Sequence, residues 1–170
     1  MGDGRKIKYK KCLIATGGRP RTLEVFNNFG ADHVTTYRNL HDFDHMESLI
    51  SNKMIKSVAI IGGGFLGTEL AYSMAQKSKK TGLKITQILR EKGHLSKILP
   101  EYLSNSTTAK IRSEGVEVFE ENTVKSAFLD DQGKVNITTN TGKNVQVDHV
   151  VVAIGKFSNF SKTNQCKDFL

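Results

Sequence analysis

The chain has 170 residues, of which 25 are Lys or Arg and 17 are Asp or Glu, so its formal net charge is +8. This length suits one domain of ordinary size, and Val, Ile, Leu and Phe recur in periodic blocks, which excludes a disordered composition. The sequence contains no apolar run of ~18 residues, no secretory signal pattern and no CxxC, which argues against a membrane span, a secreted disulfide framework and a thioredoxin-type redox pair.

The first 38 residues predict a strand and a connecting segment. Cys12–Ala15 form a short apolar run that ends at Gly17 and Gly18, which predicts a buried strand closed by a glycine turn. The following residues, up to Arg38, predict a loop with one helical turn and a short strand from Val34. A helix is expected from Asn39, because apolar residues follow at spacings of three and four: Leu40, Phe43, Met46, Leu49 and Ile50.

The middle of the chain alternates strand and helix patterns. The expected elements are a strand at Ser57–Ile61, a helix at Phe65–Lys80, a strand at Lys84–Leu89, a helix at Glu101–Glu114 with Pro100 in its first turn, and a strand at Val116–Phe119. This order is typical of a mononucleotide-binding half of a parallel sheet.

The last third changes to short strands joined by Asp-, Asn- and Gly-rich turns. Three strands are expected, at Thr123–Leu129, Lys134–Thr139 and Asn144–Val147, followed by a buried return strand over Asp148–Gly155 and a polar, frayed tail. The predicted fold is therefore α/β: a Rossmann-like domain over residues 39–155, with a parallel βαβαβ sheet plus a three-stranded antiparallel β-meander.

A glycine motif follows the first strand of the βαβαβ unit. The residues Gly62-Gly63-Gly64-Phe65-Leu66-Gly67 match GxGxxG. In this pattern the first glycine turns the chain, the second (Gly64) lets the backbone approach a pyrophosphate, and Gly67 allows close packing of helix on strand. The position between a strand and a helix favours dinucleotide binding over a purely structural glycine turn.

A second signal follows the second strand. Glu91 lies where a carboxylate accepts hydrogen bonds from the adenine ribose hydroxyls and repels a 2′-phosphate, which favours NAD(H). Arg90 and Lys92 flank it, so NADP(H) stays an alternative, as does an ordinary solvated loop acid. The five histidines lack metal-ligand spacing, and no metal site is predicted.

The N-terminal segment carries most of the net charge. Residues 1–21 hold seven basic residues and one acid, a net +6. One interpretation is a solvated strand edge protected by lysines, and the other is a patch that binds a polyanion. The basic residues are Arg5, Lys6, Lys8, Lys10, Lys11, Arg19 and Arg21.

Several motifs resemble the NAD(H)-binding domain of glutathione-reductase-like flavoprotein reductases, and among these the family of mitochondrial apoptosis-inducing factors. They are Lys11–Gly18 (KCLIATGG), Ile60–Leu70 (IIGGGFLGTEL), Glu91–Gly93 (EKG) and Lys97–Asn105 (KILPEYLSN). The similarity extends over roughly residues 8–159. It departs from the family pattern at 156–159, where KFSN stands in place of a glycine-x-x-proline-asparagine continuation.

The resemblance implies roles for individual residues. Phe65 and Leu66 are expected at the nicotinamide–flavin boundary, and Glu69 on the nicotinamide carboxamide. Lys97 is expected on another part of the dinucleotide. Gly155 is expected in the nicotinamide pocket, and Arg38 is expected to reach FAD. Core packing for Phe65 and Leu66, and ordinary solvation for Glu69 and Lys97, are the alternatives.

The resemblance also implies a whole-protein function. The intact protein is expected to be an NADH-dependent FAD oxidoreductase, and residues 1–38 and 156–170 are expected to connect this domain with an FAD domain and a C-terminal domain. The segment alone, without flavin, is expected to bind nucleotide weakly and to catalyse nothing. A homodimer, location in the mitochondrial intermembrane space, release to cytosol and nucleus in caspase-independent cell death, and sequence-independent DNA binding through Lys11 and Arg21 are implied as well. An NAD(P)H domain of another FAD-dependent reductase is the alternative.

Overall fold

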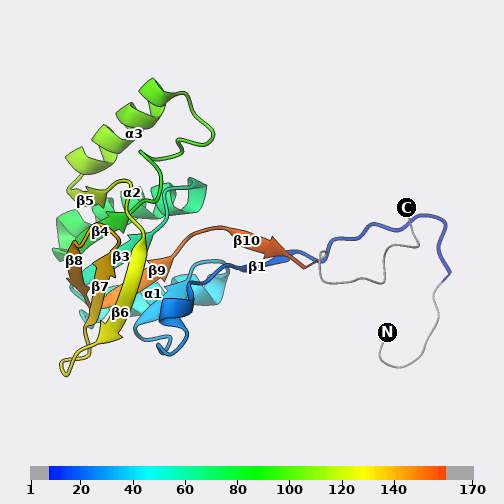
Figure 1. Ribbon diagram of the computed structural model, residues 1–170. Helices are drawn as coiled ribbons and strands as arrows, with labels where there is room; N and C mark the ends of the chain where they lie inside the picture. Colours follow the sequence, from blue (N-terminus) through cyan, green and yellow to red (C-terminus); the bar gives the residue numbers. More distant parts are fainter. Residues whose placement is uncertain (1–7, 160–170) are drawn as a thin grey trace. The chain divides into compact units, whose positions relative to one another are not determined.

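The computed structural model describes residues 8–159, which divide into two compact units (Figure 1). The described part of the first unit comprises residues 8–19 and 156–159, and the second unit comprises residues 20–155. Strand β1 (Gly18–Pro20), whose first two residues belong to the first unit, pairs with strand β10 (Lys156–Ser158). The Arg19 guanidinium lies 5.5 Å from the centre of the Phe157 ring, and the Asn159 side chain donates a hydrogen bond to the Thr16 carbonyl oxygen.

Two predictions for this first unit were wrong. Residues 12–15 form neither strand nor helix, and Leu13 is 91% exposed. A strand needs a hydrogen-bonded neighbour, and in the described part of this unit such pairing is confined to β1 and β10. The tail does not fray at Lys156, because residues 156–158 form β10; residues 160–170, like Arg5 and Lys6, lie outside the described residues.

The second unit is built on a five-stranded parallel sheet. Its strand order is β2-β9-β3-β4-β5, and every neighbouring pair runs parallel. The strands are β2 (Val34–Thr36), β3 (Ser57–Ile61), β4 (Lys84–Ile88), β5 (Val116–Phe119) and β9 (His149–Val152). The predicted βαβαβ unit is confirmed as β3, β4 and β5 with their connecting helices, and the return strand β9 lies between β2 and β3.

The helices begin and end largely where the sequence predicts. They are α1 (Leu40–Ser51), α2 (Phe65–Thr81), α3 (Glu101–Ser113) and a 3-10 turn, η1 (Glu24–Phe26). Pro100 is the N-cap of α3 rather than part of its first turn. In α1 the buried face holds Met46, Leu49 and Ile50, whereas Leu40 and Phe43 are exposed, contrary to the predicted apolar face. None of the helices within residues 8–159 combines the length and the apolar composition that a membrane span requires.

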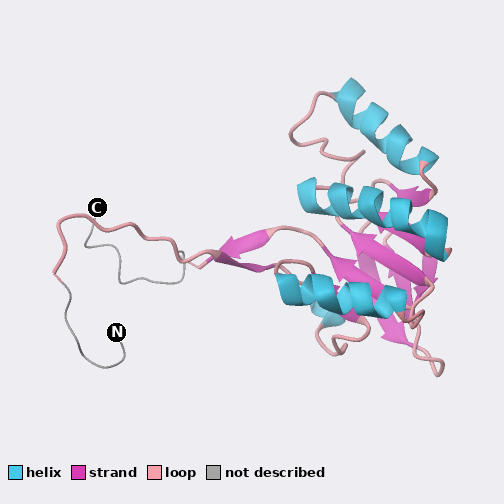
Figure 2. Ribbon diagram, turned by 180° about the vertical axis from the view of Figure 1, so that it is seen from behind, coloured by secondary structure: helices cyan, strands magenta, loops and turns pink. Residues whose placement is uncertain are grey.

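The parallel sheet separates two apolar layers. Val58 and Ile60 of β3 belong to the core formed with α1 and α2, which cover one face of the sheet (Figure 2). Ala59 and Ile61 belong to the core on the opposite face, because successive side chains of a strand point to opposite sides. That face is covered by the predicted antiparallel meander, drawn in front of the sheet in Figure 1: β6 (Val124–Leu129), β7 (Val135–Thr139) and β8 (Asn144–Val147).

Candidate dinucleotide-binding site

A cavity of about 430 Å³ lies in the second unit, at the carboxyl ends of β3, β4 and β9. This is the edge where open parallel sheets bind their ligands. Three chain segments that follow these strands line it, and a fourth segment, after β5, completes the wall. They are residues 62–64, 90–91 with 95–98, 153–155 and 122–124.

The glycine turn between β3 and α2 is held by close backbone packing. Gly62 has φ +120°, and a Cβ built on it lies 2.4 Å from the Ala153 carbonyl oxygen. A Cβ on Gly67 lies 2.2 Å from the Gly62 carbonyl oxygen. Distances this short leave no room for a side chain, so both positions require glycine for the fold itself.

Gly64 has a different environment. It is the N-cap of α2 with φ −75°, and a Cβ built on it meets no atom within 4 Å. Its backbone therefore needs neither a glycine conformation nor a glycine-sized space within the protein. The N–H groups that begin a helix have no partner inside that helix, and the helix dipole makes this end positive. The open space beside Gly64 therefore fits an anionic group such as a pyrophosphate.

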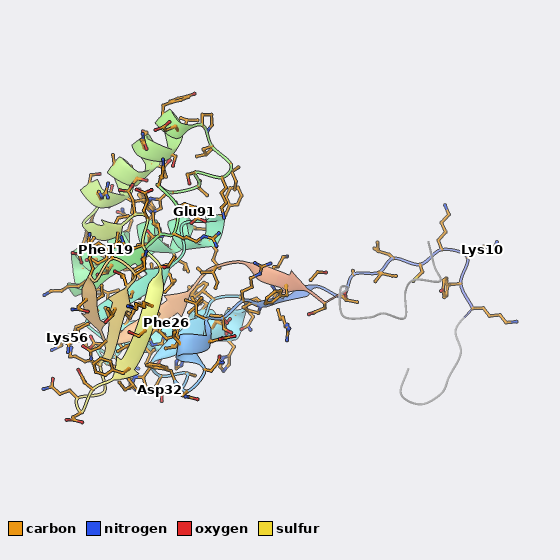
Figure 3. All side chains as sticks on the ribbon, viewed as in Figure 1. Lys10, Phe26, Asp32, Lys56, Glu91 and Phe119 are labelled. Carbon is orange, nitrogen blue, oxygen red and sulfur yellow. The ribbon has the colours of Figure 1, made fainter. Side chains whose placement is uncertain are left out.

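Glu91 lies at the cavity, just beyond the end of β4 (Figure 3). Lys97 Nζ lies 2.8 Å from its Oε1, and Arg90 donates to the same oxygen at 3.1 and 3.3 Å. Partial burial alone would raise the pKa of Glu91, but the hydrogen bonds from Lys97 and Arg90 hold that pKa below its usual value. Among the described residues none donates to Oε2, so this oxygen is available to accept a hydrogen bond.

The structure brings together part of the predicted site. Gly62, Gly63, Gly64, Glu91, Lys97 and Gly155 all line the cavity. Lys97 is predicted to bind the dinucleotide, and the structure shows it paired with Glu91. Gly155 has φ +98°, and its carbonyl oxygen accepts a hydrogen bond from the Arg21 backbone N–H at 2.9 Å.

Other predicted residues lie outside the cavity lining. Phe65, 67% exposed, and Leu66, 37% exposed, stand on the first turn of α2, so neither is a core residue. Glu69 lines a separate shallow groove between α2 and α3. Arg38 precedes α1, and its backbone N–H donates to the Asp42 carboxylate at 2.7 Å. The binding roles predicted for all four residues stay predictions.

The two predicted DNA-binding residues belong to different units. Lys11 is exposed in the first unit, whereas Arg21 lines the cavity of the second. Their role in DNA binding stays a prediction. Within residues 8–159, no group of three or more His, Cys, Asp or Glu side chains is arranged to hold a metal ion.

Sequence reasoning missed much of the cavity wall. Part of it has a recognisable signal, because residues that follow parallel strands meet at the ligand-binding edge. The apolar residues of the 95–98 loop and the start of β6 carry no such signal in the sequence. The missed residues are Leu23, Ile61, Ile88, Leu95, Ser96, Ile98, Asn122, Thr123, Val124, Ala153 and Ile154, together with Arg21, which is predicted only as a DNA contact.

Comparison with known proteins identifies the family. Residues 1–165 match the family model described as pyridine nucleotide-disulphide oxidoreductase. The chain belongs to this family. Its members are NAD(P)H-dependent flavoprotein oxidoreductases, which bind NAD(P)H and FAD.

Curated relatives within this oxidoreductase family confirm the resemblance to apoptosis-inducing factors. The chain is 39% identical over 160 residues to apoptosis-inducing factor 1, mitochondrial, of Dictyostelium discoideum, with 94% of the chain and 30% of the relative covered. It is 38% identical over 159 residues to a putative apoptosis-inducing factor 1, mitochondrial, of Drosophila melanogaster, with 91% of the chain and 21% of the relative covered. The chain thus spans less than a third of the length of these two relatives.

Solved structures of reductases share the fold. A ferredoxin reductase from Rhodopseudomonas palustris has a TM-score of 0.80 at 22% identity, covering 94% of this chain and 38% of its own. The putidaredoxin reductase–putidaredoxin complex has a TM-score of 0.77 at 25% identity, with the same coverage. The predicted fold class is therefore confirmed.

Proposed function

We propose that this chain is the NAD(H)-binding domain of an apoptosis-inducing-factor-like flavoprotein oxidoreductase, in which NADH donates a hydride to FAD. The observation that carries the proposal is the environment of Gly64. A helix begins at this residue beside open space, and a carboxylate lies at the neighbouring strand end of the same cavity. A volume of about 430 Å³ is within the usual range for a small-molecule site.

In this proposal the chain's residues bind and orient the dinucleotide. The N–H groups at the start of α2 receive the pyrophosphate, and Glu91 accepts hydrogen bonds from the adenine ribose hydroxyls through Oε2. NADH is preferred to NADPH because a 2′-phosphate beside Glu91 would place two negative charges in contact. Arg90 and Lys97 are both ion-paired with Glu91, so a 2′-phosphate gains their attraction only by competing with that carboxylate.

The nicotinamide end is proposed to lie toward Gly155 and the first turn of α2. The cofactor pair supplies hydride transfer from the nicotinamide to the flavin, a step that depends on orientation rather than on a protein base. Exposed Phe65 and Leu66 would face the flavin side, Glu69 would hold the carboxamide, and Arg38 would reach FAD. Residues 1–38 and 156–170 are proposed to connect to the FAD-binding part of the protein.

The role of the whole protein is proposed from the named relatives. Both are called mitochondrial apoptosis-inducing factors, which supports a mitochondrial location and a part in cell death. Location in the intermembrane space, release to cytosol and nucleus, and a homodimer belong to the same proposal. An NAD(P)H domain of another FAD-dependent reductase is the alternative.

A second proposal concerns the basic N-terminal segment. Lys8, Lys10 and Lys11 are all exposed in the described part of the chain, and Lys10 is labelled in Figure 3. Clustered cations of this kind attract a polyanion, and contacts with phosphates give binding without base preference. We propose non-specific DNA as the ligand, with Lys11 and Arg21 among the contacts.

A pair of matched glycine substitutions tests the main proposal. Gly64→Val places a branched side chain where the pyrophosphate must approach, while Gly30→Val places the same side chain in open space away from the cavity. By isothermal titration, Gly64→Val should lower NADH affinity at least tenfold, and Gly30→Val should bind as the unaltered chain does. The valine at the N-cap costs about 1 kcal/mol, so the melting temperature of Gly64→Val should fall by only about 2–4 °C. Equal NADH affinity in both variants would refute the proposal.

A further inference from the structure

A buried glutamine lies beneath the glycine turn. Gln87 is in β4, in register with Ile60 of β3 and Val118 of β5, at a position that a parallel sheet normally fills with an apolar side chain. It is 0% exposed and does not line the cavity. Its Nε2 donates to the carbonyl oxygens of Gly62, at 2.8 Å, and Gly67, at 3.0 Å. A buried amide is tolerated only when it is hydrogen-bonded, and here its partners are the glycine turn itself.

The orientation of the Gln87 amide determines which neighbouring atoms donate hydrogen bonds and which accept them. Both glycine oxygens can only accept, so Nε2 of Gln87 must face them and Oε1 must face the other way. Oε1 lies 2.7 Å from Nε2 of His94, which therefore carries a hydrogen and donates it. Burial lowers the pKa of His94 to about 4, so the ring is neutral at pH 7 and its Nδ1 is an acceptor.

Helix α3 holds His94 in turn. The Thr108 hydroxyl lies 3.0 Å from Nδ1 of His94 and also accepts the His94 backbone N–H at 3.0 Å. The Ser104 hydroxyl donates to the His94 carbonyl oxygen at 2.7 Å. All three residues are buried, with His94 at 0% exposed. A chain of buried hydrogen bonds thus runs from α3 through His94 and Gln87 to both ends of the glycine turn.

This series of hydrogen bonds fixes the orientation of the peptide groups that a pyrophosphate would meet. In a trans peptide the C=O and N–H point in opposite directions, so holding the Gly62 oxygen toward Gln87 turns the Gly63 N–H away from it. The Gly63 oxygen is held as well, by the Leu95 N–H at 2.8 Å, immediately after His94 in the sequence. Leu95 has φ +56°, a conformation that a non-glycine residue keeps only when its surroundings impose it.

We propose that Gln87 and His94 are positioning residues, which hold the glycine turn in the orientation that binds the pyrophosphate. The inference rests on the proposed function, because it concerns affinity for the dinucleotide. Neither side chain touches the ligand: Gln87 acts through the oxygens of Gly62 and Gly67, and His94 acts through Gln87. The sequence gives no sign of this arrangement, since a single glutamine within a strand has no recognisable pattern.

The test compares two glutamines changed in the same way. Gln87→Met keeps the side-chain length and removes every hydrogen bond to the turn. Gln76→Met makes the same change on α2, where Gln76 bonds to Glu114 away from the cavity. NADH affinity is measured by isothermal titration at a temperature where circular dichroism shows each variant folded. We expect Gln87→Met to lose at least tenfold in affinity and Gln76→Met to lose none. A merely structural role would lower the melting temperature of Gln87→Met and leave its NADH affinity unchanged, which would overturn the inference.

A second pair serves if Gln87→Met does not fold. Thr108→Val keeps the side-chain shape and removes the hydroxyl that holds His94. Thr107→Val is the matched change at a half-buried position of α3 outside the cavity. We expect a threefold or greater loss of NADH affinity for Thr108→Val only, and equal affinities would overturn the inference.

Failure of the proposed function looks different: the unaltered chain would not bind NADH. If it binds NADH, and Gly64→Val weakens binding at least tenfold while Gln87→Met and Thr108→Val do not weaken it, only the inference fails.

Discussion

Two buried histidines should make the stability of this chain depend strongly on pH. Burial lowers the pKa of both His94 and His149 from 6.5 to about 4. Both are 0% exposed, and each is held by hydrogen bonds on both ring nitrogens: His149 bonds to the Asp32 carbonyl oxygen and the Thr35 hydroxyl, each at 2.9 Å. In the folded state both rings therefore stay neutral well below pH 6.5.

The direction of the effect follows from proton binding. Below pH 6.5 the unfolded chain protonates these rings and the folded chain does not, so the free energy of unfolding falls as the pH falls toward 4. A shift of this size corresponds to about 3 kcal/mol for each histidine at pH 4, and to about 3 kcal/mol for both together at pH 5.5. This loss is a large part of the free energy of unfolding of a typical domain, which is about 5–15 kcal/mol. Above about pH 7.5 the contribution is constant, because the unfolded rings are then neutral as well.

Urea unfolding at pH 7.5, 6.5 and 5.5 measures this loss. The carboxylates of Asp148 and Glu91 have lowered pKa values and contribute only below about pH 4.5, so this pH range isolates the histidines. His149→Gln should roughly halve the loss between pH 7.5 and 5.5, and His41→Gln, on the exposed side of α1, should leave it unchanged. A free energy of unfolding that is constant from pH 7.5 to 5.5 would show that the two rings are not buried as described.

Two further predictions concern ligands. Glu91→Ala should narrow the preference for NADH over NADPH, because it removes the carboxylate that repels the 2′-phosphate and leaves Arg90 and Lys97 to attract it; equal affinities of the unaltered chain for both nucleotides would refute the ribose assignment. For duplex DNA, the slope of log affinity against log salt should be about −4 to −5, and Lys11→Ala with Arg21→Ala should flatten it by roughly two units. A salt-independent affinity, or an unchanged slope in the double variant, would leave these cations as surface charges only.

The sequence predicts the centre of the fold because its signals there are local. A β-branched run, a glycine cluster and an amphipathic helix follow one another between Ser57 and Thr81, and the structure confirms each element within a few residues. The hairpins of the meander are confirmed for the same reason, since their turns are specified by adjacent Asp, Asn and Gly. The apolar run at Cys12–Ala15 has the same local pattern and forms no strand, because a strand also requires a neighbour that local sequence does not specify.

The parts of the candidate site that belong to a sequence motif were predictable. The parts that depend on contacts between residues far apart in the sequence were not. Gly64 and Glu91 occupy expected positions at the cavity. The ion pair between Lys97 and Glu91 was not expected, because it depends on the path of the loop after β4. The same loop places His94 against Gln87, and no spacing rule links a strand glutamine to a loop histidine.

The central claim is that NADH binds at the glycine turn, and a titration followed by amide resonances tests it most directly. NADH is added to the isotopically labelled chain, and the backbone signals that move are mapped on the structure. Saturable shifts at Gly63, Gly64 and Phe65, and in the 95–98 loop, are the predicted result, while the signals of the outer β6–β7 turn stay in place. Shifts confined to residues outside the cavity, or no saturable shift at all, would contradict the account.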